Sequence, residues 1–263
     1  MKTIYKSFHV SQSVDNVKKI MTFLKNEHGI NHFRFDDDEF FIYLKRSIEL
    51  LTHLKKLNIR WETSVRIDSI LRMDDDFLVL MEESGCIKLE IGVESGSNRI
   101  LKLMNKKITR NNTIEANRKL AKYDLNIMFL FMIGFPTETL EDMKKTVSLA
   151  LQLKRENKRA RVSHFSMFTP FPGCELHDLA IQYGLKPPDC LEKLATFHQA
   201  ADNAVWLSKD IRRTAKMLSF TTPFLNDPVD SYPQLHIKLL GILYRYIARQ
   251  RIKYLFFYFP LEI

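Results

Sequence analysis

The sequence predicts an α/β fold built on a mainly parallel sheet, followed by a helical C-terminal appendage. Five short apolar segments alternate with amphipathic helical segments over residues 13–167. Repeated strand–helix units require right-handed crossovers, which leaves a doubly wound sheet or a barrel. Beyond Gly184 the alternation ends, and Pro187 and Pro188 mark a break. We therefore expect an α/β domain over residues 1–184 and a helical appendage over residues 185–263.

The bounds of each element follow from apolar spacing and from residues that begin and end helices. The first helix begins at Ser13, a typical N-cap, and ends at Gly29. The expected strands are 30–35, 60–65, 87–93, 127–133 and 161–167. The expected helices between them are 41–57, 74–84, 110–123 and 140–156. In helix 41–57 the residues expected to face the core are Leu44, Ile48, Leu51 and Leu54.

Composition excludes several classes of protein. The 263 residues include 45% hydrophobic and 27% charged residues, which is ordinary for a globular protein. The formal charge of +9 is spread over helical faces, so nucleic-acid binding is not expected. No run reaches the roughly 18 apolar residues of a spanning helix, and no signal-peptide pattern is present, so we expect a cytoplasmic protein. The three cysteines, Cys86, Cys174 and Cys190, are too far apart for a close-spaced metal motif.

Ligand sites of both candidate architectures lie at the C-terminal ends of strands, where polar residues recur in this sequence. Asp36, Asp37 and Asp38, continued by Glu39, follow the first strand. They could bind a divalent cation, accept hydrogen bonds from an ammonium group, or cap the next helix. Arg66 follows the second strand and could pair with a ligand carboxylate or with that acidic run. No histidine follows a strand directly, which argues against a metal-independent barrel enzyme.

The third strand ends in the sequence 94–97, which is the most informative turn in the chain. Glu94 follows a buried strand, where a carboxylate needs a hydrogen-bond donor such as a ribose diol or a backbone NH group. Ser95, Gly96 and Ser97 are small, and we expect them to present exposed NH groups to a ligand. The alternative is that Ser97 is simply the N-cap of a helix.

Two further segments are candidates for function. Gly134 and Pro136 form a tight turn after the fourth strand, with Glu138 close enough to cap the next helix. The segment 234–259 is amphipathic and basic, which favours either contact with a membrane surface or a helix that covers the barrel or an absent partner domain.

These segments, in this order, resemble the radical S-adenosylmethionine enzymes, and most closely the branch that often carries an upstream cobalamin-binding domain. The resemblance covers residues 13–184. Its marks are Phe33-Arg34-Phe35-Asp36-Asp37-Asp38-Glu39-Phe40, Trp61 with Arg66 and Asp68, Gly85-Cys86, Ile91-Gly92-Val93-Glu94-Ser95-Gly96-Ser97, Ile133-Gly134-Phe135-Pro136-Thr137-Glu138-Thr139, and Thr169-Pro170-Phe171-Pro172-Gly173.

The resemblance implies a partial barrel of six strand–helix units with S-adenosylmethionine held across the strand ends. In the family a 4Fe-4S cluster reduces this cofactor to a 5′-deoxyadenosyl radical, which abstracts a substrate hydrogen. By family position, Asp36, Asp37 and Asp38 lie near the methionine amino group, and Arg66 near its carboxylate. Glu94, Ser95, Gly96 and Ser97 correspond to the ribose contact, and Gly134 and Pro136 to the adenine contact.

One departure from the family is severe. The family ligates its cluster through a C-x-x-x-C-x-x-C loop after the first strand, and this chain has no such loop. Its five strands correspond to the second through sixth strands of the family, so we expect a TIM-like barrel that lacks its first strand and a sequence truncated at its N-terminus. The expected function is a radical S-adenosylmethionine enzyme core whose substrate is open, with a cluster loop outside the chain and, as often in the branch it resembles, a cobalamin domain upstream. The alternative is a non-catalytic remnant that binds a nucleoside or a partner protein.

Overall fold

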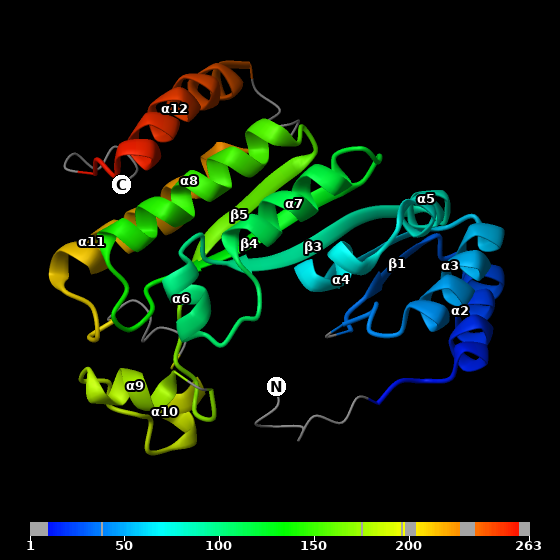
Figure 1. Cartoon of the computed structure of the whole chain (residues 1–263), viewed down its shortest axis with the longest axis horizontal. Helices are drawn as coiled ribbons and strands as arrows, with labels where there is room; N and C mark the ends of the chain where they lie inside the picture. The colour runs from blue at the N-terminus through cyan, green and yellow to red at the C-terminus, as the bar shows by residue number, and fades with distance from the viewer. Residues whose placement is uncertain are drawn as a thin grey trace. The chain divides into compact units, whose positions relative to one another are not determined.

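The computed structural model describes residues 10–37, 39–174, 176–195, 197, 204–226 and 235–257 (Figure 1). The elements, in chain order, are α2 Val14–His28, β1 His32–Phe35, α3 Leu44–Leu57, β2 Arg60–Val65, α4 Ile67–Arg72, α5 Asp75–Glu83, β3 Cys86–Glu94, α6 Asn98–Leu103, α7 Arg110–Leu120, β4 Asn126–Ile133, α8 Leu140–Glu156, β5 Ala160–Met167, α9 His177–Gln182, α10 Leu191–Ala195, α11 Lys209–Thr221, the 3₁₀-helix η2 Thr222–Leu225 and α12 Leu235–Tyr254.

The five strands form one parallel sheet in the order β1-β2-β3-β4-β5, so each strand pairs with its neighbours in the sequence. Phe33 lies opposite Trp61, and Thr63 lies opposite Leu89. The register between β2 and β3 shifts once, between Trp61 and Glu62. The predicted α/β class and all five strands are confirmed, with strand bounds within two residues of those expected.

Two compact units make up the chain. Unit 1 comprises residues 1–92, 111–129 and 153–161, and unit 2 comprises residues 93–110, 130–152 and 162–263. In unit 1, α2 packs against α3, and α3 against α5 (Figure 1). The predicted ends of α2 are confirmed: the Ser13 side chain accepts a hydrogen bond from the Asn16 NH at 3.3 Å, and Gly29 adopts the left-handed conformation with φ of 66°.

One core residue of α3 was predicted wrongly. Ile48 is exposed, whereas Leu50, Leu51 and Leu54 are buried. The buried stripe of this helix also includes Ser47, so it follows the spacing i, i+3, i+4, i+7 from Ser47. That stripe leaves Ile48 on the side of the helix that faces solvent.

Unit 2 contains a second hydrophobic core, beside the C-terminal ends of β4 and β5. It joins Ile100 of α6, Phe135, Phe168 and Trp206 with apolar residues around α9. Residues on both sides of Gly184 therefore pack together in this unit. Helix α12 contacts α11 and η2. Within the described residues, no helix is both long enough and apolar enough to cross a membrane.

Candidate functional site

In the acidic run after β1, which lies in unit 1, some side chains are exposed to solvent and others contact neighbouring residues of the protein. Asp36 and Asp37 are exposed, and Asp36 accepts a hydrogen bond from Arg34 Nε at 2.6 Å. Asp38 lies outside the described residues. Glu39 turns inward, where its Oε1 accepts hydrogen bonds from the Phe41 NH and the Ser69 hydroxyl, each at 3.2 Å. Burial raises the pKa of the Glu39 carboxyl.

Arg66 pairs mainly with Asp68, and it approaches the acidic run, its expected alternative partner, only at Glu39. Its Nε and Nη2 each donate to the Asp68 carboxylate at 2.9 Å, and its Nε lies 3.7 Å from Glu39 Oε2. The hydrogen bonds to Asp68 raise the pKa of Arg66. The guanidinium is half exposed, so one of its edges remains accessible to a ligand carboxylate.

Sequence reasoning missed a charged network on one face of the sheet in unit 1. Arg34 Nη2 lies 2.9 Å from Glu90 Oε2, and Lys88 Nζ lies 2.6 Å from Glu90 Oε1. Lys88 also lies 3.2 Å from Glu62 of the neighbouring strand. The hydrogen bond from Arg34 lowers the pKa of Glu90. The signal for this face was present, because polar residues alternate with buried apolar residues along β2 and β3.

Glu94, the first member of the predicted ribose contact, is the last residue of β3 in unit 2. Its backbone is in the left-handed region with φ of 65°, which is uncommon for a residue other than glycine. Lys106 Nζ donates to its Oε1 at 2.6 Å, and the side chain is 19% exposed. Among the described residues the carboxylate has no other partner, so Oε2 can accept a hydrogen bond from a ligand.

The loop Ser95–Ser97 is built differently from the expectation. The Ser95 NH donates to the Val93 carbonyl at 2.9 Å, the Gly96 NH donates to Thr146 Oγ1 at 3.0 Å, and the Ser97 NH donates to Ser95 Oγ at 3.1 Å. All three residues are buried. The expected exposed NH groups are therefore engaged inside the protein.

Gly96 is required by the close approach of this loop to α8. A Cβ atom at this position would lie 2.4 Å from the Lys145 carbonyl oxygen and 2.7 Å from the Thr146 Cα. Both neighbours are backbone atoms, so neither can move aside without a shift of the helix. Ser97 is the N-cap of α6, as the alternative proposed, but its side chain makes no capping hydrogen bond.

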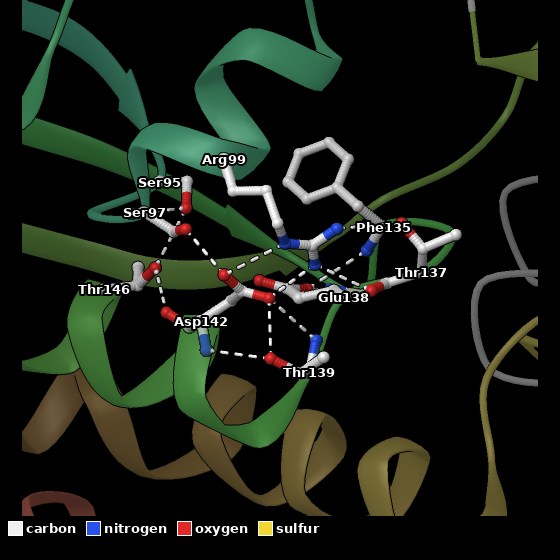
Figure 2. Close-up of polar contacts among 10 residues, drawn as sticks. Ser95, Ser97, Arg99, Phe135, Thr137, Glu138, Thr139, Asp142 and Thr146 are labelled. Carbon is white, nitrogen blue, oxygen red and sulfur yellow. Dashed lines mark hydrogen bonds and ion pairs between the residues drawn. The ribbon is translucent and has the colours of Figure 1, made fainter.

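Asp142 of α8 connects the loop after β3 to the turn after β4, as Figure 2 shows. Its carboxylate accepts hydrogen bonds from Ser97 Oγ at 2.6 Å, from Arg99 Nη2 at 2.5 Å and from Thr139 Oγ1 at 2.7 Å. Arg99 Nη2 also donates to the Thr137 carbonyl at 2.7 Å. Burial raises the pKa of Asp142, but the donors from Arg99, Ser97 and Thr139 outweigh burial and hold it well below its usual value. The carboxylate is therefore ionised and fixed.

The turn after β4 is held by Glu138 from within. The Gly134 NH donates to Glu138 Oε2 at 2.5 Å, and the Phe135 NH donates to the same oxygen at 3.1 Å. Glu138 therefore organises the turn that precedes α8, whereas Thr139 and Asp142 form the reciprocal hydrogen bonds of a capping box at the start of that helix. Glu138 Oε1 is buried and has no hydrogen-bond partner among the residues that the structure describes, and burial raises the pKa of this carboxyl to about 8.

Trp206 covers the same turn from the C-terminal part of unit 2. Its indole Nε1 donates to the Gly134 carbonyl at 2.7 Å, and its ring packs edge-on against Phe168. Gly134 and Pro136 are both buried. Gly134 has a φ of 86°, and a Cβ atom there would come within 3.0 Å of the Met167 methyl group. The predicted adenine contact of this turn stays a prediction.

The cysteines of this chain do not form a metal site. Cys86 is buried at the start of β3, and burial raises the pKa of its thiol, whereas Cys174 and Cys190 are exposed. Over the described ranges, no group of three His, Cys, Asp or Glu side chains is placed to hold a metal ion. The donor set present here does not fit a 4Fe-4S cluster ligated by three cysteines.

Comparison with curated proteins finds several methyltransferases. The chain is 33% identical over 175 residues to an uncharacterized methyltransferase of Pyrococcus horikoshii, covering 66% of this chain and 36% of that protein. It is 28% identical over 218 residues to the cytidylyl-2-hydroxyethylphosphonate methyltransferase of Streptomyces wedmorensis, covering 78% of this chain and 39% of that protein. The chain thus spans less than half the length of these relatives.

Solved structures show the same fold. The cobalamin-dependent S-adenosylmethionine radical enzyme OxsB in its apo form matches with a TM-score of 0.61 at 17% identity, covering 97% of this chain and 45% of that chain. The radical S-adenosylmethionine methyltransferase TsrM of Kitasatospora setae matches with a TM-score of 0.53 at 18% identity, covering 68% of this chain and 33% of that chain.

A family model agrees with these likenesses and with the order of the segments described above. The model of the Radical SAM superfamily matches residues 4–150, which is more than half of the chain. This protein therefore belongs to the Radical SAM superfamily, and it resembles the cobalamin-dependent members in fold.

Proposed function

We propose that this chain is an S-adenosylmethionine-binding core of a radical S-adenosylmethionine enzyme. The observation that carries the proposal is the network through which Asp142 and Arg99 join the loop after β3 to the turn after β4. Family position assigns these two segments to the ribose and the adenine of one cofactor. A fixed, ionised carboxylate between them holds the two contacts in register.

Glu94 is the residue of this unit best suited to contact the cofactor directly. Its backbone is left-handed and precedes the buried loop 95–97, and Lys106 donates to one carboxylate oxygen. The second oxygen is left to accept hydrogen bonds from a ribose hydroxyl. The roles of Asp36 and Arg66, which lie in unit 1, at the amino and carboxylate groups of the methionine stay proposals from family position alone.

The reaction proposed for the whole protein is methyl transfer, with the substrate open. This class follows from the names of the relatives and not from a residue of this chain. Cobalamin and a 4Fe-4S cluster belong to the family members compared above, and the described residues fit neither a cluster nor a step that depends on one. The alternative is a non-catalytic remnant that retains only the nucleoside pocket.

Isothermal titration of the full chain with S-adenosylmethionine tests the proposal. We expect binding, and we expect Glu94→Gln to weaken it at least about tenfold, because a hydrogen bond to a charged acceptor is worth about 1.5–3 kcal/mol. Glu115→Gln, an exposed carboxyl on α7, is the matched control and should bind as the wild type does. The proposed pocket would be refuted if the wild-type chain gave no heat of binding, or if Glu94→Gln and Glu115→Gln bound with equal affinity.

Peripheral membrane contact through residues 234–259 is a second proposal, for α12. One side of this helix packs through Ala248 and Ile252, whereas Tyr246, Tyr254 and Arg249 are exposed. Exposed aromatic and basic side chains suit an anionic membrane surface. Sedimentation with vesicles of anionic and of neutral lipid tests this proposal. We expect the protein to sediment with anionic vesicles alone, and the double variant Tyr246→Ser/Tyr254→Ser to lose this binding. If the wild type does not sediment with either kind of vesicle, α12 is a covering helix.

A further inference from the structure

A pocket opens between the loop after β3 and the first turns of α8. It has a volume of about 510 Å³, and its lining includes Asn98, Arg99, Arg110, Lys144, Lys145 and Ser148. Glu94 is not part of this lining. The pocket is therefore separate from the proposed ribose contact, although both use the same loop, and its size suits a small ligand.

The charges of this pocket are unbalanced. Four cationic side chains line it and Glu141 is the one carboxylate among the lining residues. The charge of Arg99 is matched by Asp142. Lys144 and Lys145 are exposed on α8 and form no ion pair within the described part of the chain. Three unmatched cations therefore face one carboxylate.

Arg110 is the fixed member of this group. Its Nη1 donates to the Lys145 carbonyl at 2.7 Å, and its Nη2 donates to Gln152 Oε1 at 2.9 Å and, more weakly, to Ser148 Oγ at 3.4 Å. All three acceptors are neutral. Burial lowers the pKa of Arg110, since no carboxylate offsets the cost of desolvating its charge. A guanidinium that is held in place without a counter-ion is a ready site for an anion.

One further donor points to the same kind of ligand. Asn98 Oδ1 accepts a hydrogen bond from the backbone NH of Arg110 at 2.8 Å, which fixes the amide group in the pocket lining that the two residues share. Its Nδ2 group has no acceptor among the described residues, so it can donate to a ligand oxygen. Planar guanidinium groups and amide donors match the oxygens of a phosphate, and the two lysines add mobile positive charge.

We propose that this pocket binds the phosphate or diphosphate group of a small molecule. Arg110 and Asn98 are the fixed hydrogen-bond donors, and Lys144 and Lys145 are mobile cations that pair with the bound anion. The proposal does not depend on S-adenosylmethionine binding. It adds a second ligand site to unit 2, beside the loop that follows Glu94.

Calorimetric titration of the full chain with inorganic pyrophosphate at low ionic strength tests the proposal. We expect binding that weakens as salt is added. Lys144→Ala/Lys145→Ala should bind about tenfold more weakly, from the loss of two exposed charges worth up to about 1 kcal/mol each. Lys209→Ala removes an exposed charge outside the pocket and should bind as the wild type does.

A gain of affinity distinguishes the proposed site from damage to the fold. Glu141→Gln removes the one carboxylate of the lining and should bind pyrophosphate about two- to fivefold more tightly. The proposal is overturned if the wild type does not bind, or if these variants leave the affinity unchanged. A single-stranded oligonucleotide that binds far more tightly than pyrophosphate, with the same losses in the lysine variant, would instead identify a nucleic-acid backbone as the ligand.

Discussion

The sharpest stability prediction concerns Asp142→Asn, which keeps the shape of the side chain and removes its charge. The wild-type side chain is 4% exposed, and each of its oxygens accepts at least one hydrogen bond. Asparagine retains one acceptor oxygen, but its NH₂ group faces donors that were aimed at the other oxygen. The variant therefore loses the hydrogen bond from Ser97, whose hydroxyl is left buried, or the bonds from Thr139, which is exposed.

The magnitude follows from the exposure of each partner. A hydrogen bond to a charged group is worth about 1.5–3 kcal/mol where it is shielded, as with the buried Ser97. Arg99 is 48% exposed and is rehydrated when its partner is lost, so it adds at most about 1 kcal/mol. The total loss is about 3 kcal/mol, which lowers the melting temperature of a chain of this size by about 6–12 °C.

Thermal unfolding followed by circular dichroism measures this difference, and pH tests its electrostatic origin. The folded pKa of Asp142 is held below its ordinary value of 3.8, so its stabilisation is complete above that value and is lost as pH falls through the folded pKa. The gap between wild type and Asp142→Asn should therefore narrow in strong acid. Asp124→Asn, which removes a 71% exposed carboxylate, should cost under about 1 kcal/mol. An unchanged melting temperature in Asp142→Asn, or a gap that is equal at all pH values, would refute the reasoning.

Three further predictions concern residues around the same network. Gly96→Ala should destabilise the protein by more than about 3 kcal/mol or prevent its accumulation, since the alanine Cβ would meet backbone atoms of α8. Chemical denaturation measures the loss of stability. A variant whose free energy of unfolding lies within about 1 kcal/mol of the wild type would contradict this prediction. Trp206→Phe keeps an aromatic ring but removes the donor to the Gly134 carbonyl, so it should lower the free energy of unfolding by about 1–3 kcal/mol. An unchanged denaturation midpoint would show that the indole hydrogen bond does not contribute to stability. Glu138 has a folded pKa of about 8, above the ordinary 4.5, so its contribution to stability is complete below pH 4.5 and is lost as pH rises towards 8, by roughly 5 kcal/mol. Glu138→Gln should remove that decline, and an identical pH profile in the variant would contradict the assignment.

The fold was largely predictable because the strands and long helices carry their own periodic patterns. The bounds of β2 and α8 were predicted to the residue, and Ser13 and Gly29 mark the ends of α2 through local capping chemistry. Helices α4 and α6 were missed, since six residues are too few to show a helical period. These failures are local and do not affect the order of the sheet.

The candidate site was predictable only where its contacts are local. Thr139 and Asp142 are three residues apart at the start of α8, and this spacing of a capping box can be recognised from the sequence alone. The ion pair of Asp142 with Arg99 and the bond from Trp206 to Gly134 join residues far apart in the chain, so no local pattern announces them. The NH groups of residues 95–97 were expected to face a ligand. The structure instead engages one of them with Thr146, which lies on a different element and could not be recognised as its acceptor from the local sequence.

The indole of Trp206 has a consequence for how this protein can be rearranged. Its bond to the Gly134 carbonyl, and its place in a core shared with Ile100 and Phe135, make the C-terminal segment a partner of the turn after β4. A chimera joined at Gly184 would exchange one half of that core without the other. A transplanted C-terminal region therefore has to bring a matching β4 turn with it.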